Sequence, residues 1–215
     1  MRIEIQSRLC EPLSPLFRDA VVMEVESKYT RVEYERRFLV KPAADWKSIV
    51  QPYSKRLEDK YLSGTRLRLR TMTDLDTGRR VIKLTKKEES PSPYYRTLSR
   101  ILLAPAEFEI LNRLDGYPIN KVRYYSNHGG KVYSLDVFEG ELEGLVLSEV
   151  STDGLGELMS IEPPAFAHHE VTEDEFFDGG NLCRTSHEEL LVRLVSMEGP
   201  DASSAAHQTF EPLGE

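Results

Sequence analysis

The sequence has few cysteines and no long apolar run. Its two cysteines, Cys10 and Cys183, lie far apart in the chain of 215 residues, so we expect neither a disulfide framework nor a cysteine-based metal site. No apolar stretch is long enough for a transmembrane helix, and none follows Arg2, so we expect neither a membrane span nor a secretory signal. These absences favour a cytoplasmic protein with two inert thiols.

An excess of positive charge is also missing. The formal net charge is −8, which argues against a protein that coats nucleic acid. The acidity is concentrated near the C-terminus, because residues 160–215 hold 12 Asp/Glu and 2 Lys/Arg. Residues 1–159 hold 24 acidic and 26 basic residues. A local cationic site on an acidic protein is therefore allowed.

The length and composition fit one domain with tails. The chain is 40% hydrophobic, which is enough for a sizeable core. We expect the domain at 31–195, after an N-terminal extension of uncertain order at 1–30. Residues 196–215 are polar and small and contain Pro and Gly, so we expect a disordered tail there.

Alternation of polar and apolar residues predicts a mainly antiparallel sheet. We expect strands at 31–40, 62–72, 79–87, 94–103, 121–126, 131–140 and 142–151. Helices are expected at 42–50 and 105–114, each beginning with Pro. Two short helices follow, where Thr172 with Glu175 and Ser186 with Glu189 have capping-box spacing. His168 and His169 are expected in a loop. Closing such a sheet gives a barrel, with alternate residues of each strand inside.

The same alternation places charged residues together on single strand faces, because residues i and i+2 point the same way. Such shared faces hold Glu33, Glu35 and Arg37; Arg66, Arg68 and Arg70; Lys83, Thr85 and Lys87; and Lys121 with Arg123. Solvent exposure would be the default for these faces. However, rows of arginine repel one another without an anion, arginine suits phosphate oxygens, and paired carboxylates suit a hard divalent cation. The pattern therefore favours binding of phosphates with a metal.

At this point the residues resemble a known family. The run Glu33-x-Glu35-x-Arg37, followed by an apolar 38–40, resembles the ExExK signature of the CYTH proteins, the triphosphate tunnel metalloenzymes. Further segments resemble the family in its own order, at 67–70, 84–87, 121–124, 135–140, 148–150 and 170–174. The resemblance covers about residues 31–182 and is closest to the short bacterial inorganic triphosphatases. It implies an α+β fold, mainly an eight-stranded closed antiparallel β-tunnel with a few flanking helices.

The resemblance also implies an activity and a set of site residues. The expected activity is hydrolysis of a triphosphate, first of all inorganic tripolyphosphate, with Mg²⁺ or Mn²⁺ as cofactor. The small triphosphate or polyphosphate is the expected partner, and a homodimer is compatible with the sequence. By position, Glu35, Arg37 and Glu149 would be catalytic, and the metal would be held by Glu33, Glu35, Asp136 and Glu149. Phosphates would be bound by Arg68, Arg70, Lys87, Arg96, Lys121 and Arg123. Arg66 and Lys83 are added because each shares a strand face with some of these residues.

The sequence departs from the family pattern in four places. Arg37 replaces a lysine, which removes any role as a base because arginine stays protonated. Acids are missing at Leu98, Arg100 and Ser151, which predicts weaker metal binding or one metal. Residues 174–178 are acidic and aromatic where basic residues are usual; we expect a plain capping helix there, with a plug or a partner contact as alternatives. A non-catalytic polyphosphate- or nucleotide-binding module therefore stays open, as does an adenylate cyclase, although no residue specifies adenine.

Overall fold

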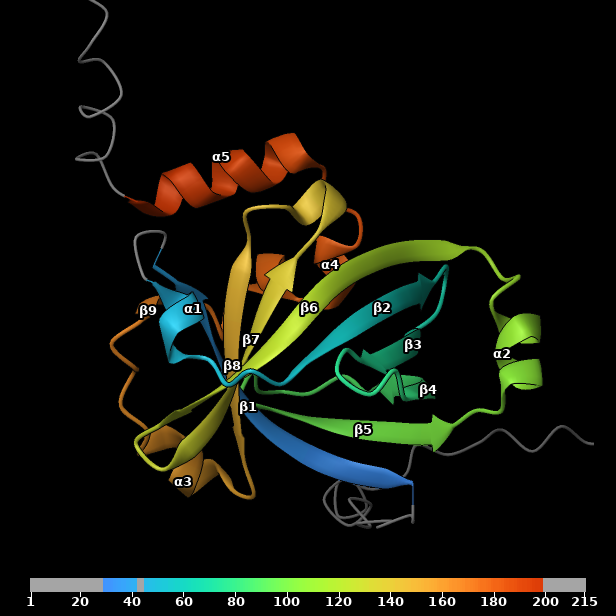
Figure 1. The fold of residues 1–215 in the computed structure, drawn as a ribbon, viewed down its shortest axis with the longest axis horizontal. Helices are drawn as coiled ribbons and strands as arrows, with labels where there is room; N and C mark the ends of the chain where they lie inside the picture. The colour runs from blue at the N-terminus through green and yellow to red at the C-terminus, as the bar shows by residue number, and fades with distance from the viewer. Residues whose placement is uncertain (1–28, 42–44, 199–215) are drawn as a thin grey trace, which may run out of the picture.

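The computed structural model describes residues 29–41 and 45–198. One nine-stranded sheet has the order β5-β4-β3-β2-β6-β7-β8-β1-β9, and additional pairing of β5 with β1 closes eight of these strands into an antiparallel barrel (Figure 1). The expected closed tunnel is therefore confirmed. The ninth strand, β9, pairs with β1 beyond the point where β5 leaves it.

The strands are β1 (Thr30–Val40), β2 (Ser54–Leu62), β3 (Leu67–Asp74), β4 (Arg80–Lys87), β5 (Tyr95–Leu102), β6 (Gly116–His128), β7 (Lys131–Phe138), β8 (Val146–Thr152) and β9 (Ala167–Glu170). The helices are α1 (Trp46–Ile49), α2 (Pro105–Leu111), α3 (Leu155–Met159), α4 (Gly179–Leu182) and α5 (His187–Glu198), with 3-10 turns η2 (Gly140–Leu142) and η3 (Glu175–Phe177). The two predicted hairpins correspond to β3–β4 and β6–β7.

Three elements were not predicted from the sequence. Strand β2 and helix α3 lie in segments without an assignment, and β9 contains His168 and His169, for which a loop was the expectation.

The capping box predicted at Thr172 was also wrong. The Thr172 hydroxyl accepts a hydrogen bond from the Arg37 amide at 3.0 Å, and Asp174 caps η3 in its place. The capping box of Ser186 and Glu189 is confirmed by reciprocal hydrogen bonds at 2.8 and 3.3 Å.

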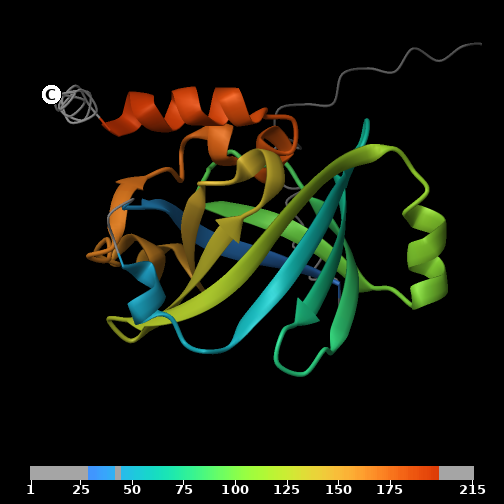
Figure 2. The same cartoon turned by 45° about the horizontal axis from the view of Figure 1, so that its top comes forward.

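One end of the barrel is closed by an apolar cluster. Lumen side chains, among them Ile119, Phe138 and Leu147, pack in one cluster with Phe177 of η3 and Leu182 of α4. We call residues 175–182, which contain η3 and α4, the cap. Helix α5 contributes its buried Leu190 to the same cluster and lies across this end (Figure 2). A second cluster covers the outward faces of β1, β7 and β8.

Helix α5 continues to Glu198, three residues beyond the domain boundary expected at 195. The rest of the expected tail, most of the expected extension, and Cys10 lie outside the described residues. Within the described part, no helix combines the length and the apolar character needed to span a membrane.

Candidate functional site

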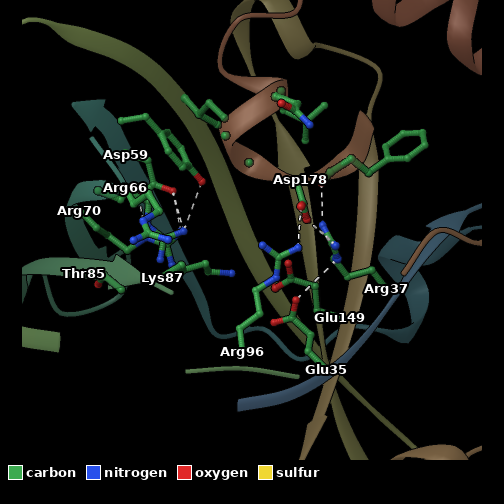
Figure 3. Close-up of a pocket in the computed structure, with 18 of the residues that line it drawn as sticks. Glu35, Arg37, Asp59, Arg66, Arg70, Thr85, Lys87, Arg96, Glu149 and Asp178 are labelled. Atoms are coloured by element: carbon green, nitrogen blue, oxygen red, sulfur yellow. Dashed lines mark hydrogen bonds and ion pairs between the residues drawn. The ribbon is translucent and has the colours of Figure 1, made fainter. Parts of the chain in front are cut away.

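The barrel encloses a cavity of about 360 Å³ (Figure 3). Among the described residues, ten basic and seven acidic side chains line it. The wall includes eleven of the thirteen expected site residues: Glu33, Glu35, Arg37, Arg66, Arg68, Arg70, Lys87, Arg96, Lys121, Arg123 and Glu149. The other two, Lys83 and Asp136, are not part of this wall. Strand alternation thus brings most of the expected residues together.

Two carboxylates, Glu35 and Glu149, face each other on neighbouring strands. Antiparallel register places Arg37 of β1 opposite Glu149 of β8, and the Arg37 Nε lies 3.7 Å from a Glu35 oxygen. Burial, and then the charge of Glu149, raises the pKa of Glu35. Burial alone would also raise the pKa of Glu149, but Arg123, which donates to it at 2.6 Å, holds that pKa below its ordinary value. In this pair, the ionised form is therefore disfavoured at Glu35 and favoured at Glu149.

This pair suits a divalent cation. No group of three or more acidic, histidine or cysteine side chains in the described residues forms a ready metal cage. However, Mg²⁺ is often bound by only one or two carboxylates, with phosphates and waters completing its shell. A cation between Glu35 and Glu149 would also relieve the repulsion that raises the pKa of Glu35. Glu33 lines the same cavity, and its partner Arg31, bonded at 2.6 Å, is 61% exposed and so binds weakly.

The fourth expected metal ligand, Asp136, has a different position. It is fully buried, and Arg123 donates to both of its oxygens at 2.5 and 2.6 Å. Lys121 also contacts it. Burial alone would raise the pKa of Asp136, but Arg123 and Lys121 lower it well below the ordinary value. Asp136 is therefore the counter-ion of two cavity cations, and both of its oxygens already accept hydrogen bonds.

An unpredicted acid, Asp59 of β2, holds two further phosphate-binding candidates in place. Arg70 donates to both Asp59 oxygens at 2.5 Å, and Arg68 lies 3.7 Å away. Burial would raise the pKa of Asp59, but these two arginines together lower it well below the ordinary value. Leu57, Asp59 and Tyr61 alternate along β2, so assignment of residues 54–62 as a strand would have placed Asp59 inside.

A second unpredicted acid, Asp178 of the cap, enters the cavity. It accepts hydrogen bonds from Arg37 and Arg96, each at 2.6 Å (Figure 3). Burial would raise its pKa, but Arg37 and Arg96 outweigh burial and lower it. The next residue, Gly179, allows this approach because a Cβ there would lie 1.9 Å from the Tyr61 hydroxyl. The acidic segment was expected to be a plain capping helix, but its last acid contacts the cationic wall.

The remaining expected cations differ in their surroundings. Arg66 lies at the edge of the cavity, paired with Glu88 at 3.4 Å and Glu89 at 2.9 Å. Lys87 extends into the lumen toward the carboxylate side (Figure 3), and burial lowers its pKa. Lys83 shares the inward face of β4 with Lys87 and is half-buried, outside the wall of the main cavity.

Comparisons with known proteins give matches among solved structures. No protein-family model matches the chain, and neither does any curated protein. Two crystal structures of NE1496, one of which names it an inorganic triphosphatase, match at 27% and 26% identity with TM-scores of 0.48 and 0.47. The matches cover 72% and 71% of this chain and 99% and 95% of NE1496.

The PH1819 protein from Pyrococcus horikoshii OT3 matches at 18% identity with a TM-score of 0.44, over 75% of this chain and 99% of its own. These likenesses are weak, and the fold rests on the chain's own strands. Eight of them form a closed antiparallel barrel, with the expected motifs on consecutive inward faces. The chain therefore has the triphosphate tunnel fold that its resemblance to the CYTH proteins predicted.

Proposed function

We propose that this protein is a divalent-metal-dependent hydrolase of triphosphates, with inorganic tripolyphosphate as its first substrate. The observation that carries the proposal is the Glu35–Glu149 pair inside a cavity otherwise rich in cations. A site that only had to bind a polyanion would gain nothing from two buried carboxylates, because they repel it. Carboxylates for a metal beside cations for phosphate are the parts that phosphoryl transfer needs.

The wall residues have separable tasks in this proposal. Lys87 and Arg123 would donate hydrogen bonds to phosphate oxygens and stabilise the charge of an in-line attack by water. Arg37 and Arg96 would do the same once their bonds to Asp178 are released, and Arg37 cannot act as a base. Glu35 and Glu149 would hold Mg²⁺ or Mn²⁺, which when bound neutralises phosphate oxygens. Burial and the charge of Glu149 raise the pKa of Glu35, and a bound cation would favour its ionised form.

A second candidate function is binding without hydrolysis. Arg100 lines the cavity as a cation where the resembling family carries an acid. Leu98, at a second such position, is buried, and Ser151 offers only a hydroxyl. A lumen with fewer acids would bind a polyanion tightly and a metal weakly. Such a protein would hold tripolyphosphate or a nucleotide and release no phosphate.

One experiment separates the two functions. Phosphate release from tripolyphosphate and from ATP is measured with Mg²⁺, with Mn²⁺ and with chelator, beside calorimetric binding of the same compounds. We expect metal-dependent release that is lost in Glu35→Gln and in Arg70→Ala. Lys86→Gln is the matched control, because Lys86 lies on β4 with its side chain 44% exposed. Tight binding without release would favour the binding module, and full activity in both variants would contradict the assignment of hydrolysis to this cavity.

A further inference from the structure

On the neighbouring strands β4 and β5, three inward-facing cations form no ion pair within 4 Å among the described residues. They are Lys83 and Lys87 of β4 and Arg100 of β5, and we call them the basic stripe. In contrast, six other inward cations of the barrel each form an ion pair within 4 Å: Arg37, Arg68, Arg70, Arg96, Lys121 and Arg123. A partly or fully buried cation without a partner is unfavourable. Among the described residues, the basic stripe therefore has no counter-ion in direct contact, and an external anion could supply one.

Strand register makes these three cations a continuous feature. Arg100 pairs with Thr85, which lies between Lys83 and Lys87 on the same face of β4. Four residues of strand span about 13 Å, so the stripe extends well beyond one phosphate group. Arg70 of β3 is the register partner of Lys83, but Asp59 already holds the Arg70 guanidinium.

The stripe begins at the carboxylate pair and leads away from it. Glu35, Glu149 and Glu33 all act on the pKa of Lys87, although burial has the larger effect and lowers it. Burial and then Arg31 lower the pKa of Arg100, and Glu33 is the one acid that opposes them. For Lys83, burial followed by Arg100 and Arg70 lowers the pKa to about 8, and no acid opposes this. Strand register gives the same order. Glu33 pairs with Arg96 of β5, and Lys87, Thr85 and Lys83 pair with Leu98, Arg100 and Leu102, which lie successively farther along that strand.

We propose that the basic stripe binds successive phosphates of a linear inorganic polyphosphate longer than tripolyphosphate, with the end of the chain at Glu35 and Glu149. This inference rests on the proposed function and names its substrate class. A phosphate chain carries a charge at every unit, so it can neutralise Lys87, Arg100 and Lys83 in turn. A nucleoside triphosphate would instead bring an uncharged sugar and base to Arg100 and Lys83, and would leave both cations unpaired.

The test compares substrates of different length. Values of kcat/KM are measured for tripolyphosphate, ATP and a longer polyphosphate of defined length, with wild type, Lys83→Gln, Lys83→Arg and the outward Lys86→Gln. A charge-assisted hydrogen bond to phosphate corresponds to about 10- to 100-fold in binding. We expect Lys83→Gln to lower the ratio of longer chain to tripolyphosphate by about tenfold or more. Lys83→Arg should keep most of the ratio, and Lys86→Gln should leave it unchanged.

Two results would overturn the inference while the proposed function stands: an unchanged ratio in Lys83→Gln, or an equal loss for ATP, tripolyphosphate and the longer chain. If no variant or wild type hydrolyses any of these compounds, the proposed function fails on its own. Calorimetry then tests the stripe separately. Weaker binding of the longer chain to Lys83→Gln than to Lys86→Gln, by about tenfold, would support it, and equal binding would overturn it.

Discussion

Replacing Asp178 by Asn should make the cavity bind phosphates more tightly and the fold less stable. Asp178 neutralises Arg37 and Arg96, which are two of the cations that a triphosphate needs. It comes from the cap, whereas both arginines come from barrel strands. In the proposed function, the carboxylate would therefore occupy the position of a ligand phosphate, and a substrate would have to displace it from both guanidinium groups.

The magnitude follows from the two hydrogen bonds at 2.6 Å. A hydrogen bond to a charged group contributes about 1.5–3 kcal/mol when well buried. The Asp178 side chain is 23% exposed and Asn keeps one oxygen acceptor, so we expect about 1–2 kcal/mol for the pair. The KM for tripolyphosphate should fall by about 5- to 30-fold. The free energy of unfolding should fall by about 1–2 kcal/mol, because the cap loses its attachment to the barrel.

Asp174→Asn is the matched control. Asp174 lies four residues earlier, caps η3 and pairs with Arg193 of α5, outside the cavity wall. Both variants should unfold at lower urea concentration than wild type. Steady-state kinetics, or calorimetry with tripolyphosphate where turnover is slow, should show tighter binding in Asp178→Asn alone.

Competition between Asp178 and the ligand is refuted if Asp178→Asn loses stability but its KM for tripolyphosphate is unchanged or higher. Asp178 would then be an acid that helps to arrange the phosphate site, in the manner of Asp59, and would not compete with the ligand. A gain in affinity of equal size in Asp174→Asn would also refute it, because that gain would come from a loosened cap and not from free arginines.

Three further predictions concern the other acids. Asp136→Asn leaves Lys121 and Arg123 without a buried counter-ion, so urea unfolding should show a loss of about 3–5 kcal/mol. Folding lowers the pKa values of Asp59 and Asp136. Their contribution to the free energy of unfolding is therefore present above the ordinary carboxyl pKa of about 3.9 and is lost as the pH falls below it. Urea midpoints should drop toward pH 3, less steeply in Asp59→Asn. Folding raises the pKa of Glu35 above 4.5, so Mn²⁺ affinity by calorimetry should increase as the pH rises past that value, and Glu35→Gln should flatten this dependence.

The sequence predicts the barrel well where the evidence is local. Hairpins such as β3–β4 and β6–β7 follow from alternation and from turn residues close to them in the chain. Strand β2 was missed because Glu58, Asp59 and Lys60 are charged on both faces, so the alternation of polar and apolar residues is interrupted there. The contacts of Asp59 with Arg70 and Arg68 make that position favourable, but those contacts exist only after folding.

The candidate site divides in the same way. Parity along single strands placed the carboxylates and most cations inside, because a strand fixes which side chains share a face. It did not say which cations are already neutralised. Asp178 lies 141 residues from Arg37 in the chain, and no local pattern connects them. Thr172 shows the opposite case. Its spacing from Glu175 fits a capping box, but its hydroxyl accepts a tertiary hydrogen bond from the Arg37 amide and does not cap a helix.

The acids of the lumen also differ in whether a ligand can replace them. Asp59 and Asp136 are 4% and 0% exposed and belong to barrel strands, so they stay in place and hold their arginines and lysine in fixed positions. Asp178 is more exposed and comes from a short cap segment. The ten basic and seven acidic wall residues leave three positive charges in surplus, and displacement of Asp178 adds a fourth at Arg37 and Arg96. In the proposed function, a polyphosphate would therefore meet the largest positive charge only after it has moved Asp178, the wall acid that comes from the cap.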